Sequence, residues 1–202
     1  MLQIAVTGSI GSGKSFILKS CRNILKAKTI SSDEMVHQLY KEDEIIFNAV
    51  KNLFPDAISK NVIDRQKLGE IVFNDPQKRK TLQDIVYPRL RSKREELLKL
   101  YRRQGVRICF FEIPLLFENN MQKNFDYVIT VYCSKYIQKQ RVLKRKKMSG
   151  QKFNAILAAQ MPVSKKLAKS SFAINTGRSK AVTLKKLIEI YRQISESKFR
   201  IK

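Results

Sequence analysis

The sequence predicts an α/β fold with a parallel five-stranded sheet flanked by helices, together with a helical insertion and a lid. Two observations lead to this fold class. Short apolar runs alternate with helical stretches along most of the 202 residues, a pattern typical of parallel strands joined by helices. A glycine-rich segment also joins the first apolar run to the first helical stretch, which is the form of an opening βα unit.

Five apolar runs are predicted to form the sheet. The first, Leu2–Thr7, ends at the glycine-rich loop, and a helix is predicted over Ser15–Lys26. The other strand candidates are Lys28–Ser31, Val106–Ile113, Tyr127–Tyr132 and the weaker Phe172–Ile174. Because such runs are apolar without alternation, the sheet is expected to be buried between layers of helices.

The long stretch between the second and third strands contains no convincing strand and is predicted to be a helical insertion. Helical patterns cover Asp43–Leu53, Arg65–Phe73 and Gln77–Arg103, and Pro88 is expected to kink or interrupt the last of them. Nothing marks an independent domain boundary. The predicted division of the single domain is a core of residues 1–40 and 104–202, an insertion of residues 41–103 and a lid of residues 134–165.

Charge is the unusual feature of the composition. Lysine and arginine total 41 against 17 acidic residues, which gives a formal net charge of +24. A field of this sign attracts polyanions, so phosphorylated metabolites and nucleic acids both qualify as partners. The hydrophobic fraction of 43% is ordinary for a globular chain and argues against extensive disorder.

Membrane spans and secretion signals are not indicated. The longest apolar stretch, Ile108–Phe117, is interrupted by Glu112 and Pro114 and is too short to span a bilayer. The first residues lack the basic region of a signal peptide. We therefore expect a cytoplasmic protein that has no membrane partner.

The three cysteines and the single histidine suggest no metal or disulfide chemistry. Cys21, Cys109 and Cys133 are widely spaced without a C-x-x-C pair, and the last two lie in or beside strand candidates, where core packing is expected. His37 is the only histidine and has no evident partner for metal ligation or for a serine relay.

The segment Gly8–Ser15 reads G-S-I-G-S-G-K-S and matches the phosphate-binding pattern G-x-x-x-x-G-K-[ST] between a strand and a helix. Glycines at 8, 11 and 13 allow the backbone, including Ser12, to turn its N–H groups inward around phosphate oxygens. Lys14 would add a positive charge, and the Ser15 hydroxyl would ligate Mg²⁺. The alternative is an inconsequential Gly/Ser-rich turn.

Asp33 is the predicted catalytic base. It follows the second strand candidate, so it is expected at the carboxyl edge of the sheet beside the phosphates. A carboxylate there can orient an acceptor hydroxyl and take its proton. The alternative is that Asp33 caps the following helix, although Ser32 could take that role.

Two arginines, Arg141 and Arg145, are predicted to lie four residues apart on one helical face after the strand ending at Tyr132. Such a pair can clamp phosphates, because the guanidinium group bonds two oxygens at once. The alternative is a solvated basic face. The adjoining run of basic residues 144–147 also motivates a nucleic-acid-binding NTPase as a competing class.

Taken together, these motifs resemble the dephospho-coenzyme A kinase family along nearly the whole chain. The residue sequence of the glycine loop is similar to that of the family, and Asp33 matches the family's catalytic aspartate. Further matching blocks are Asp64-Arg65-x-x-Leu68, Pro114-Leu-Leu-Phe-Glu118, Gln138-x-x-Arg141 with Arg145, Gln160-Met-Pro162 with Lys166 and Ala168, and Ile174-Asn175-Thr-Gly177. The Pro114–Glu118 block is the most telling, since other kinases with this loop do not normally carry it.

The resemblance implies transfer of the ATP γ-phosphoryl group to the ribose 3′-hydroxyl of dephospho-coenzyme A, the final step of coenzyme A biosynthesis. It assigns Asp33, Lys14 and Arg141 to catalysis. It assigns Asp33, Arg65, Pro114 and Glu118 to the acceptor, Phe16, Arg145 and Asn175 with the glycine loop to the nucleotide, and Ser15 and Glu112 to Mg²⁺. No nucleic acid is required, and a monomer or weak homo-oligomer is expected.

This chain departs from the family pattern at several positions. Tyr87 stands where a histidine usually precedes the proline, Lys146 replaces an acid, and Glu112 replaces a frequent aspartate. Phe16 replaces a common threonine, but it would bind phosphate through its backbone N–H. A nucleoside or nucleotide kinase of similar fold therefore remains the other alternative.

Overall fold

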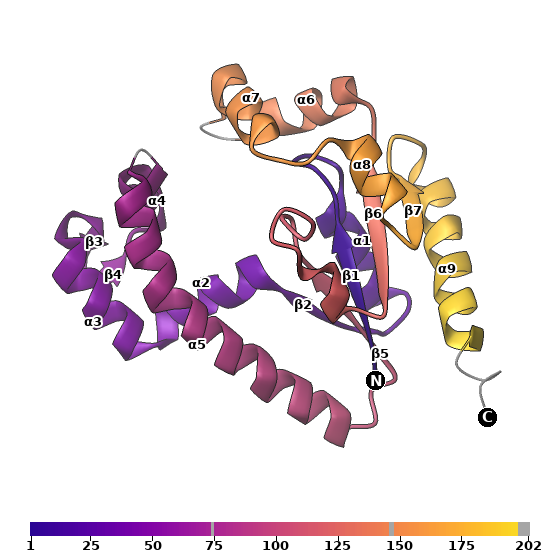
Figure 1. Ribbon diagram of the computed structural model, residues 1–202, viewed down its shortest axis with the longest axis horizontal. Helices are drawn as coiled ribbons and strands as arrows, with labels where there is room; N and C mark the ends of the chain where they lie inside the picture. Colours follow the sequence, from indigo (N-terminus) through magenta and orange to yellow (C-terminus); the bar gives the residue numbers. More distant parts are fainter. Residues whose placement is uncertain (74, 146–147, 198–202) are drawn as a thin grey trace. The chain divides into compact units, whose positions relative to one another are not determined.

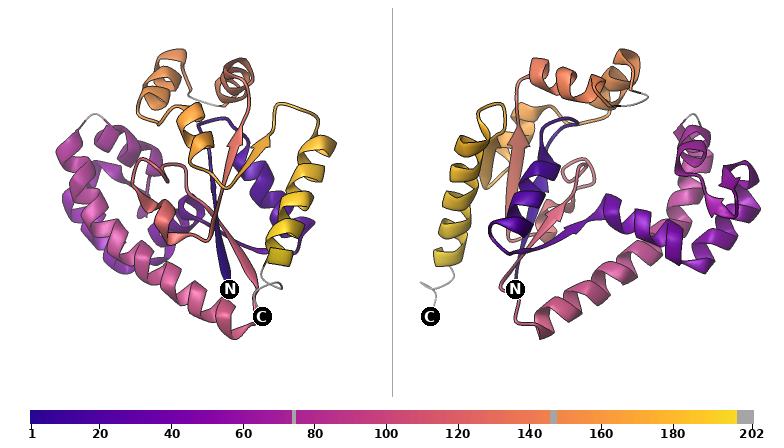
Figure 2. Two further views of the ribbon diagram at one scale, coloured as in Figure 1. Left: turned by 45° about the vertical axis from the view of Figure 1, so that its right-hand side comes forward. Right: turned by 180° about the vertical axis from the view of Figure 1, so that it is seen from behind.

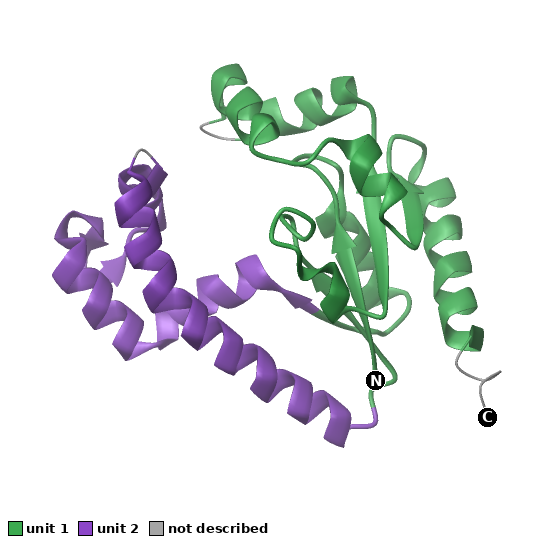
Figure 3. Cartoon of the chain, viewed as in Figure 1, with its two compact units in different colours: residues 1–29, 106–202 green, residues 30–105 purple. Residues whose placement is uncertain are grey.

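A computed structural model describes residues 1–73, 75–145 and 148–197 (Figure 1). The expectations for Lys146 and for the end of the basic run at Lys147 lie outside these residues. The chain folds as two compact units, one of residues 1–29 and 106–202 and the other of residues 30–105 (Figure 3).

A five-stranded parallel sheet has the order β2-β5-β1-β6-β7, which confirms the predicted fold class. The strands are β1 (Leu2–Thr7), β2 (Lys28–Ser31), β5 (Ile108–Glu112), β6 (Tyr127–Tyr132) and β7 (Phe172–Asn175). β1 is central, and its Val6 pairs with Glu112 on one side and Ile129 on the other. Its last four residues are buried, as expected for a strand covered on both faces.

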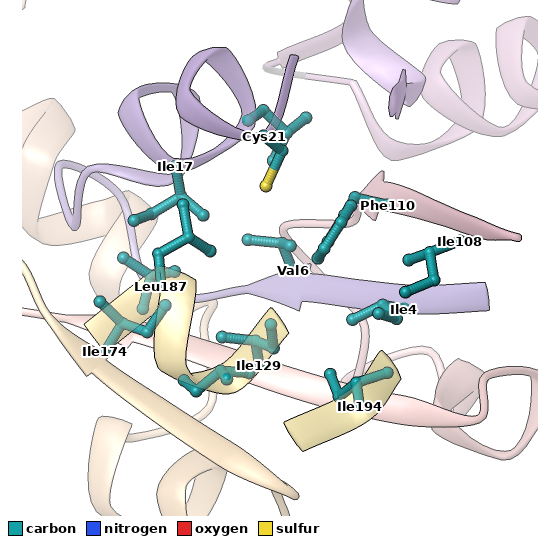
Figure 4. Close-up of a cluster of buried hydrophobic side chains, with 13 residues drawn as sticks. Ile4, Val6, Ile17, Cys21, Ile108, Phe110, Ile129, Ile174, Leu187 and Ile194 are labelled. Atoms are coloured by element: carbon teal, nitrogen blue, oxygen red, sulfur yellow. The ribbon is translucent and has the colours of Figure 1, made fainter. Parts of the chain in front are cut away.

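Two helices of the first unit, α1 (Lys14–Asn23) and α9 (Lys180–Ser197), pack together against the strands in one apolar cluster. The unit also contains the 3-10 helix η2 (Met121–Asn124), α6 (Lys135–Leu143), α7 (Gly150–Ala158) and α8 (Val163–Ala168). Figure 4 shows Ile17 and Cys21 of α1 and Leu187 and Ile194 of α9 meeting side chains of the strands, Ile129 among them. Side chains of a strand alternate between its two faces, so every second residue of β1 packs into this cluster. This packing fixes the position of β1 and of the loop that follows it.

Figures 1 and 2 show α6 and α7 beyond the carboxyl ends of β1 and β6, on the side where β1 runs into the glycine loop. In open α/β sheets, ligands bind at this edge. No helix among the described residues is long and apolar enough to span a membrane.

Over its described residues, the second unit contains four α-helices, one 3-10 helix and a small hairpin. Its elements are α2 (Ser32–Glu42), α3 (Glu44–Leu53), the 3-10 helix η1 (Pro55–Ala57), β3 (Ile58–Ser59), β4 (Val62–Ile63), α4 (Arg65–Phe73) and α5 (Pro76–Arg103). Each of the last three α-helices begins behind an aspartate, and Asp43, Asp64 and Asp75 all accept hydrogen bonds from first-turn amides. A separate apolar cluster that includes Ile46, Leu68 and Val86 forms its core.

Two expectations for this unit were wrong. The stretch contains the two-residue strands β3 and β4, joined by Lys60 and Asn61 at φ values of 51° and 58°. A lysine seldom adopts a positive φ, so the turn gave only a weak signal in the sequence. Of the two alternatives for Pro88, interruption was wrong, because α5 runs continuously through it from Pro76 to Arg103, and the kink stays a prediction.

Candidate nucleotide and phosphate site

The glycine loop leads directly from β1 into α1, as the motif requires. Gly8, Gly11 and Gly13 have φ values of 148°, 73° and 92°, in the region that L side chains rarely adopt. Space excludes side chains here as well. A Cβ on Gly11 would lie 2.7 Å from Val142 Cγ2, one on Gly13 would lie 3.0 Å from Thr176 Oγ1, and one on Gly8 would collide with Val131 O.

Lys14 folds back over the loop that precedes it. Its Nζ donates to Gly8 O at 2.8 Å and to Ser9 O at 3.1 Å, and the side chain is buried. Ser12 is fully buried, and its hydroxyl has no hydrogen-bond partner among the described residues. Ser15 is exposed at the start of α1. The ammonium group thus already lies over the loop to which phosphates would bind.

The start of α1 has no side-chain cap, because its N-cap residue is Gly13. Phe16 N and Ile17 N both donate to Gly13 O, at 3.1 and 3.3 Å. The expected contribution of Phe16 N–H to phosphate binding stays a prediction. The uncapped helix start is compatible with an anion, since the N-terminal end of a helix carries partial positive charge.

Thr176 holds the glycine loop from the side of β7. Its hydroxyl lies 2.6 Å from Ser12 O and 3.3 Å from Tyr132 O, and its backbone N donates to Tyr132 O at 2.8 Å. Asn175, predicted to contact the nucleotide, accepts a 2.8 Å bond from Gly177 N through Oδ1. The segment after β7 is therefore a tight turn pressed against the loop.

Arg141 is bound to the same turn. Its Nη1 donates to Thr176 Oγ1 at 3.0 Å and to Gly11 O at 3.4 Å, and its Nη2 donates to Thr176 O at 2.8 Å. The predicted sharing of one helical face by the two arginines was wrong, because α6 ends at Leu143 and Arg145 lies beyond it in an exposed bend. The role of each arginine toward phosphate stays a prediction.

Glu112 is the last residue of β5 and pairs with Val6 in the ladder beside β1. Ile113 N then donates to Val6 O at 3.1 Å, which keeps this end of β5 next to the start of the glycine loop. A carboxylate here and the Ser15 hydroxyl offer oxygen ligands, the type that Mg²⁺ prefers. The described residues contain no cluster of three or more His, Cys, Asp or Glu side chains able to hold a metal by themselves.

Glu118 and Pro114 form a buried polar cluster with Lys166. Lys166 Nζ donates to Glu118 Oε1 at 2.9 Å and to Pro114 O at 3.3 Å, and the lysine side chain has 0% exposure. Glu118 Oε1 also accepts from Met161 N at 2.7 Å. Burial raises the pKa of Glu118, but the bonds from Lys166 and from backbone amides outweigh burial and hold it below its usual value.

Asp33 and Arg65 belong to the second unit. Asp33 is the second residue of α2 and is exposed, and no hydrogen bond or ion pair involves its carboxylate within the described parts of the chain. Both capping alternatives were wrong, since Ser31 Oγ accepts from Glu34 N at 3.4 Å. Arg65 begins α4. Burial lowers the pKa of His37, and the charge of Arg65 lowers it further. Burial raises the pKa of Tyr40, and Arg65 acts against that rise.

Cys109 and Cys133 are buried, as expected, and so is Cys21. All three are buried and free, and burial raises the pKa of Cys21 and of Cys109 to about 12. Burial also raises the pKa of Cys133, although Arg141 acts against it. A raised pKa disfavours the thiolate form at these positions.

A central parallel strand that ends in a glycine loop with a lysine over it, followed at once by a helix, defines a P-loop kinase. The family model described as dephospho-CoA kinase matches residues 2–181, so the chain belongs to the dephospho-CoA kinase family.

Individual relatives agree with this assignment. A dephospho-CoA kinase of Bartonella quintana (strain Toulouse) is 37% identical over 194 residues, which cover 95% of this chain and 97% of that protein. The solved dephospho-CoA kinase from Campylobacter jejuni is 30% identical with a TM-score of 0.70, covering 97% of this chain and 98% of that one. TT1252 from Thermus thermophilus is 26% identical with a TM-score of 0.81, covering 95% and 96%.

Replacing Thr176 by valine is expected to weaken ADP binding about tenfold, or about 1.4 kcal/mol. The change keeps the shape of the side chain but leaves Ser12 O and Arg141 Nη1 without their partner. Isothermal titration measures the affinity. Thr183→Val is the matched control, since Thr183 is also buried but bonds chiefly to Ser179 O at the start of α9. An equal loss in both variants would remove Thr176 from the site.

Lowering the pH is expected to close the stability gap between the original protein and Glu118→Gln. Because the pKa of Glu118 is lowered in the fold, its contribution is fully present above the unfolded pKa of about 4.3 and is lost as pH falls through the folded pKa. Denaturant unfolding at a series of pH values measures the gap. A gap that stayed constant from neutral into strongly acidic solution would contradict this assignment.

Proposed function

We propose that this protein transfers the γ-phosphoryl group of ATP to the ribose 3′-hydroxyl of dephospho-coenzyme A, the last step of coenzyme A biosynthesis. The observation that carries the proposal is the complete phosphate loop with Lys14 folded over it, in a chain that matches the dephospho-CoA kinase family over residues 2–181. Nothing in the described site favours a nucleic-acid-dependent NTPase or a nucleoside kinase.

ATP would bind with its phosphates on the glycine loop. Lys14 Nζ lies on Gly8 O and Ser9 O, and exchanging these carbonyl oxygens for phosphate oxygens would replace dipoles by charges. Gly8, Gly11, Ser12, Gly13 and Phe16 would supply backbone groups, and Asn175 with the turn after β7 would border the base. The loop would then bind the triphosphate with little rearrangement of its backbone.

Asp33 would act as the base for the acceptor hydroxyl. It follows β2 by two residues, and the carboxyl ends of parallel strands share one edge of a sheet. Its carboxylate makes no bond that would have to be broken among the described residues. A positioned carboxylate of this kind can take the hydroxyl proton as the bond to phosphorus forms.

Mg²⁺ would be held by the Ser15 hydroxyl and, through water, by Glu112. Bound there, the cation supplies neutralisation of the charge shared between the β- and γ-phosphates. Arg141 and Arg145 would add positive charge to the transferring group, and Arg65, Pro114 and Glu118 would contribute to the acceptor site. Residues 134–165 would form a lid that excludes water. We place the reaction in the cytoplasm, with no membrane or nucleic acid required.

An ATP-consumption assay tests the proposal directly. Parallel reactions with dephospho-coenzyme A, with nucleoside monophosphates and with single-stranded nucleic acid are expected to show turnover only with the first. Phosphorus NMR of the product would place the new phosphate on the 3′-oxygen. Turnover stimulated only by nucleic acid, or equal turnover with nucleoside monophosphates, would reject it.

Asp33→Asn is expected to lower kcat about 100- to 1,000-fold with little change in ADP affinity, because the amide keeps the size of the side chain but cannot accept the proton. Steady-state kinetics with dephospho-coenzyme A and titration with ADP measure the two effects. Glu34→Gln, which alters the neighbouring exposed carboxylate, is the control and should leave kcat nearly unchanged. Wild-type turnover in Asp33→Asn would assign the base elsewhere.

A further inference from the structure

A largely buried ion pair lies in the first unit, where the Glu118 side chain is 16% exposed. Lys166 has 0% exposure and its Nζ lies 2.9 Å from Glu118 Oε1. Removing an ammonium group and a carboxylate from water is costly, and apolar side chains of similar size stabilise such positions at least as well. Glu118 Oε2 is in addition buried without a partner among the described residues. Stability alone therefore gives a poor reason for this pair.

The pair connects to the glycine loop by an unbroken series of bonds. Glu118 Oε1 accepts from Met161 N at 2.7 Å, which fixes the backbone next to Gln160. Gln160 Oε1 in turn accepts from Ile10 N of the loop at 3.0 Å. An ionised carboxylate is a strong acceptor, so its bond to Met161 N fixes the backbone position from which the Gln160 side chain reaches the loop.

A second arm reaches the start of the same loop. Lys166 Nζ also donates to Pro114 O, and Thr7 Oγ1 lies 3.4 Å from that oxygen. Thr7 is fully buried and immediately precedes Gly8. Together the two arms fix the loop at Thr7 and at Ile10, on both sides of its first glycine.

This arrangement determines which loop amides face a ligand. The N–H of Ile10 already donates to Gln160, while Lys14 Nζ donates to Gly8 O. A loop held in this way before nucleotide arrives has less conformational freedom to lose on binding.

We propose that Lys166 and Glu118 are positioning residues for phosphoryl transfer, which act through Gln160 and Ile10 to set the shape of the phosphate loop before ATP binds. The inference rests on the proposed function and deepens it. Neither residue touches the reacting atoms in this role. The segment 160–166 accordingly belongs to the fixed frame of the site, at the end of the predicted lid.

Three variants test the role. In Lys166→Met and in Gln160→Leu, kcat/KM for ATP is expected to fall about 10- to 100-fold, because small displacements of a reactive group cost rate of this order. ADP affinity should fall several-fold, and amide hydrogen exchange of the peptide covering residues 8–13 should accelerate in the nucleotide-free protein. Lys165→Met, on the exposed neighbouring lysine of α8, should change none of these.

The double variant Glu118→Leu/Lys166→Met separates positioning from stability. Removing both charges should restore most of the thermal stability lost in Lys166→Met, since no unpaired charge remains buried. ADP affinity and the slow hydrogen exchange of the loop should stay impaired, because Met161 N has lost its acceptor. Recovery of ADP affinity and of slow loop exchange together with stability would show a purely structural pair and would overturn the proposal.

The outcomes also distinguish the two proposals. Loop exchange and ADP affinity need no acceptor, so they report on the positioning role even if dephospho-coenzyme A is not phosphorylated by the unmutated protein. Conversely, normal loop exchange in Lys166→Met and Gln160→Leu would reject the positioning role while leaving the proposed reaction intact.

Discussion

The site depends on a steric constraint at the glycine loop, which passes too close to its surroundings to carry side chains. Gly8 lies against the carbonyl of Val131, Gly11 lies against α6, and Gly13 lies against Thr176. These contacts come from β6, from the helix after it and from the turn after β7. The phosphate loop is thus shaped by the opposite end of the chain, and any residue larger than glycine would push the loop away from the elements that border the nucleotide.

Two buried lysines of the first unit have different partners, which offset the cost of removing an ammonium group from water. Lys14 is satisfied by the carbonyl oxygens of Gly8 and Ser9, which are neutral acceptors that a phosphate can replace. Lys166 is paired with the carboxylate of Glu118, an acceptor of full charge. Since an ammonium group gains more from an anion than from a dipole, phosphate oxygens would compete well with the carbonyl oxygens of Gly8 and Ser9 for Lys14, whereas Lys166 already has a carboxylate partner.

The sequence predicted what depends on local patterns. The strands β2 and β6 have the predicted bounds, and Gly8–Ser15 forms the predicted loop, because apolar periodicity and glycine spacing act over a few residues. The sequence did not predict the hydrogen bond from Thr176 Oγ1 to Ser12 O or the one from Ile10 N to Gln160 Oε1, because each joins residues more than 140 positions apart. Asn175 was assigned to the nucleotide through the family resemblance of the segment Ile174–Gly177, while the hydroxyl of the neighbouring Thr176 makes the contacts with the loop.

The end of α6 gives the two lid arginines different surroundings. Two nitrogens of Arg141 donate to Thr176 and to Gly11 O, which fixes the orientation of its guanidinium group. The residue is nevertheless exposed, so its remaining N–H groups can still donate to a ligand. Arg145 lies past the helix end, where its backbone N bonds only to Val142 O. An arginine fixed by its turn costs little entropy when a ligand binds, whereas an exposed one must be ordered by the ligand. The side chain of Arg141 is therefore already oriented by the protein, whereas that of Arg145 is not, and the contribution of either arginine to phosphate binding stays a prediction.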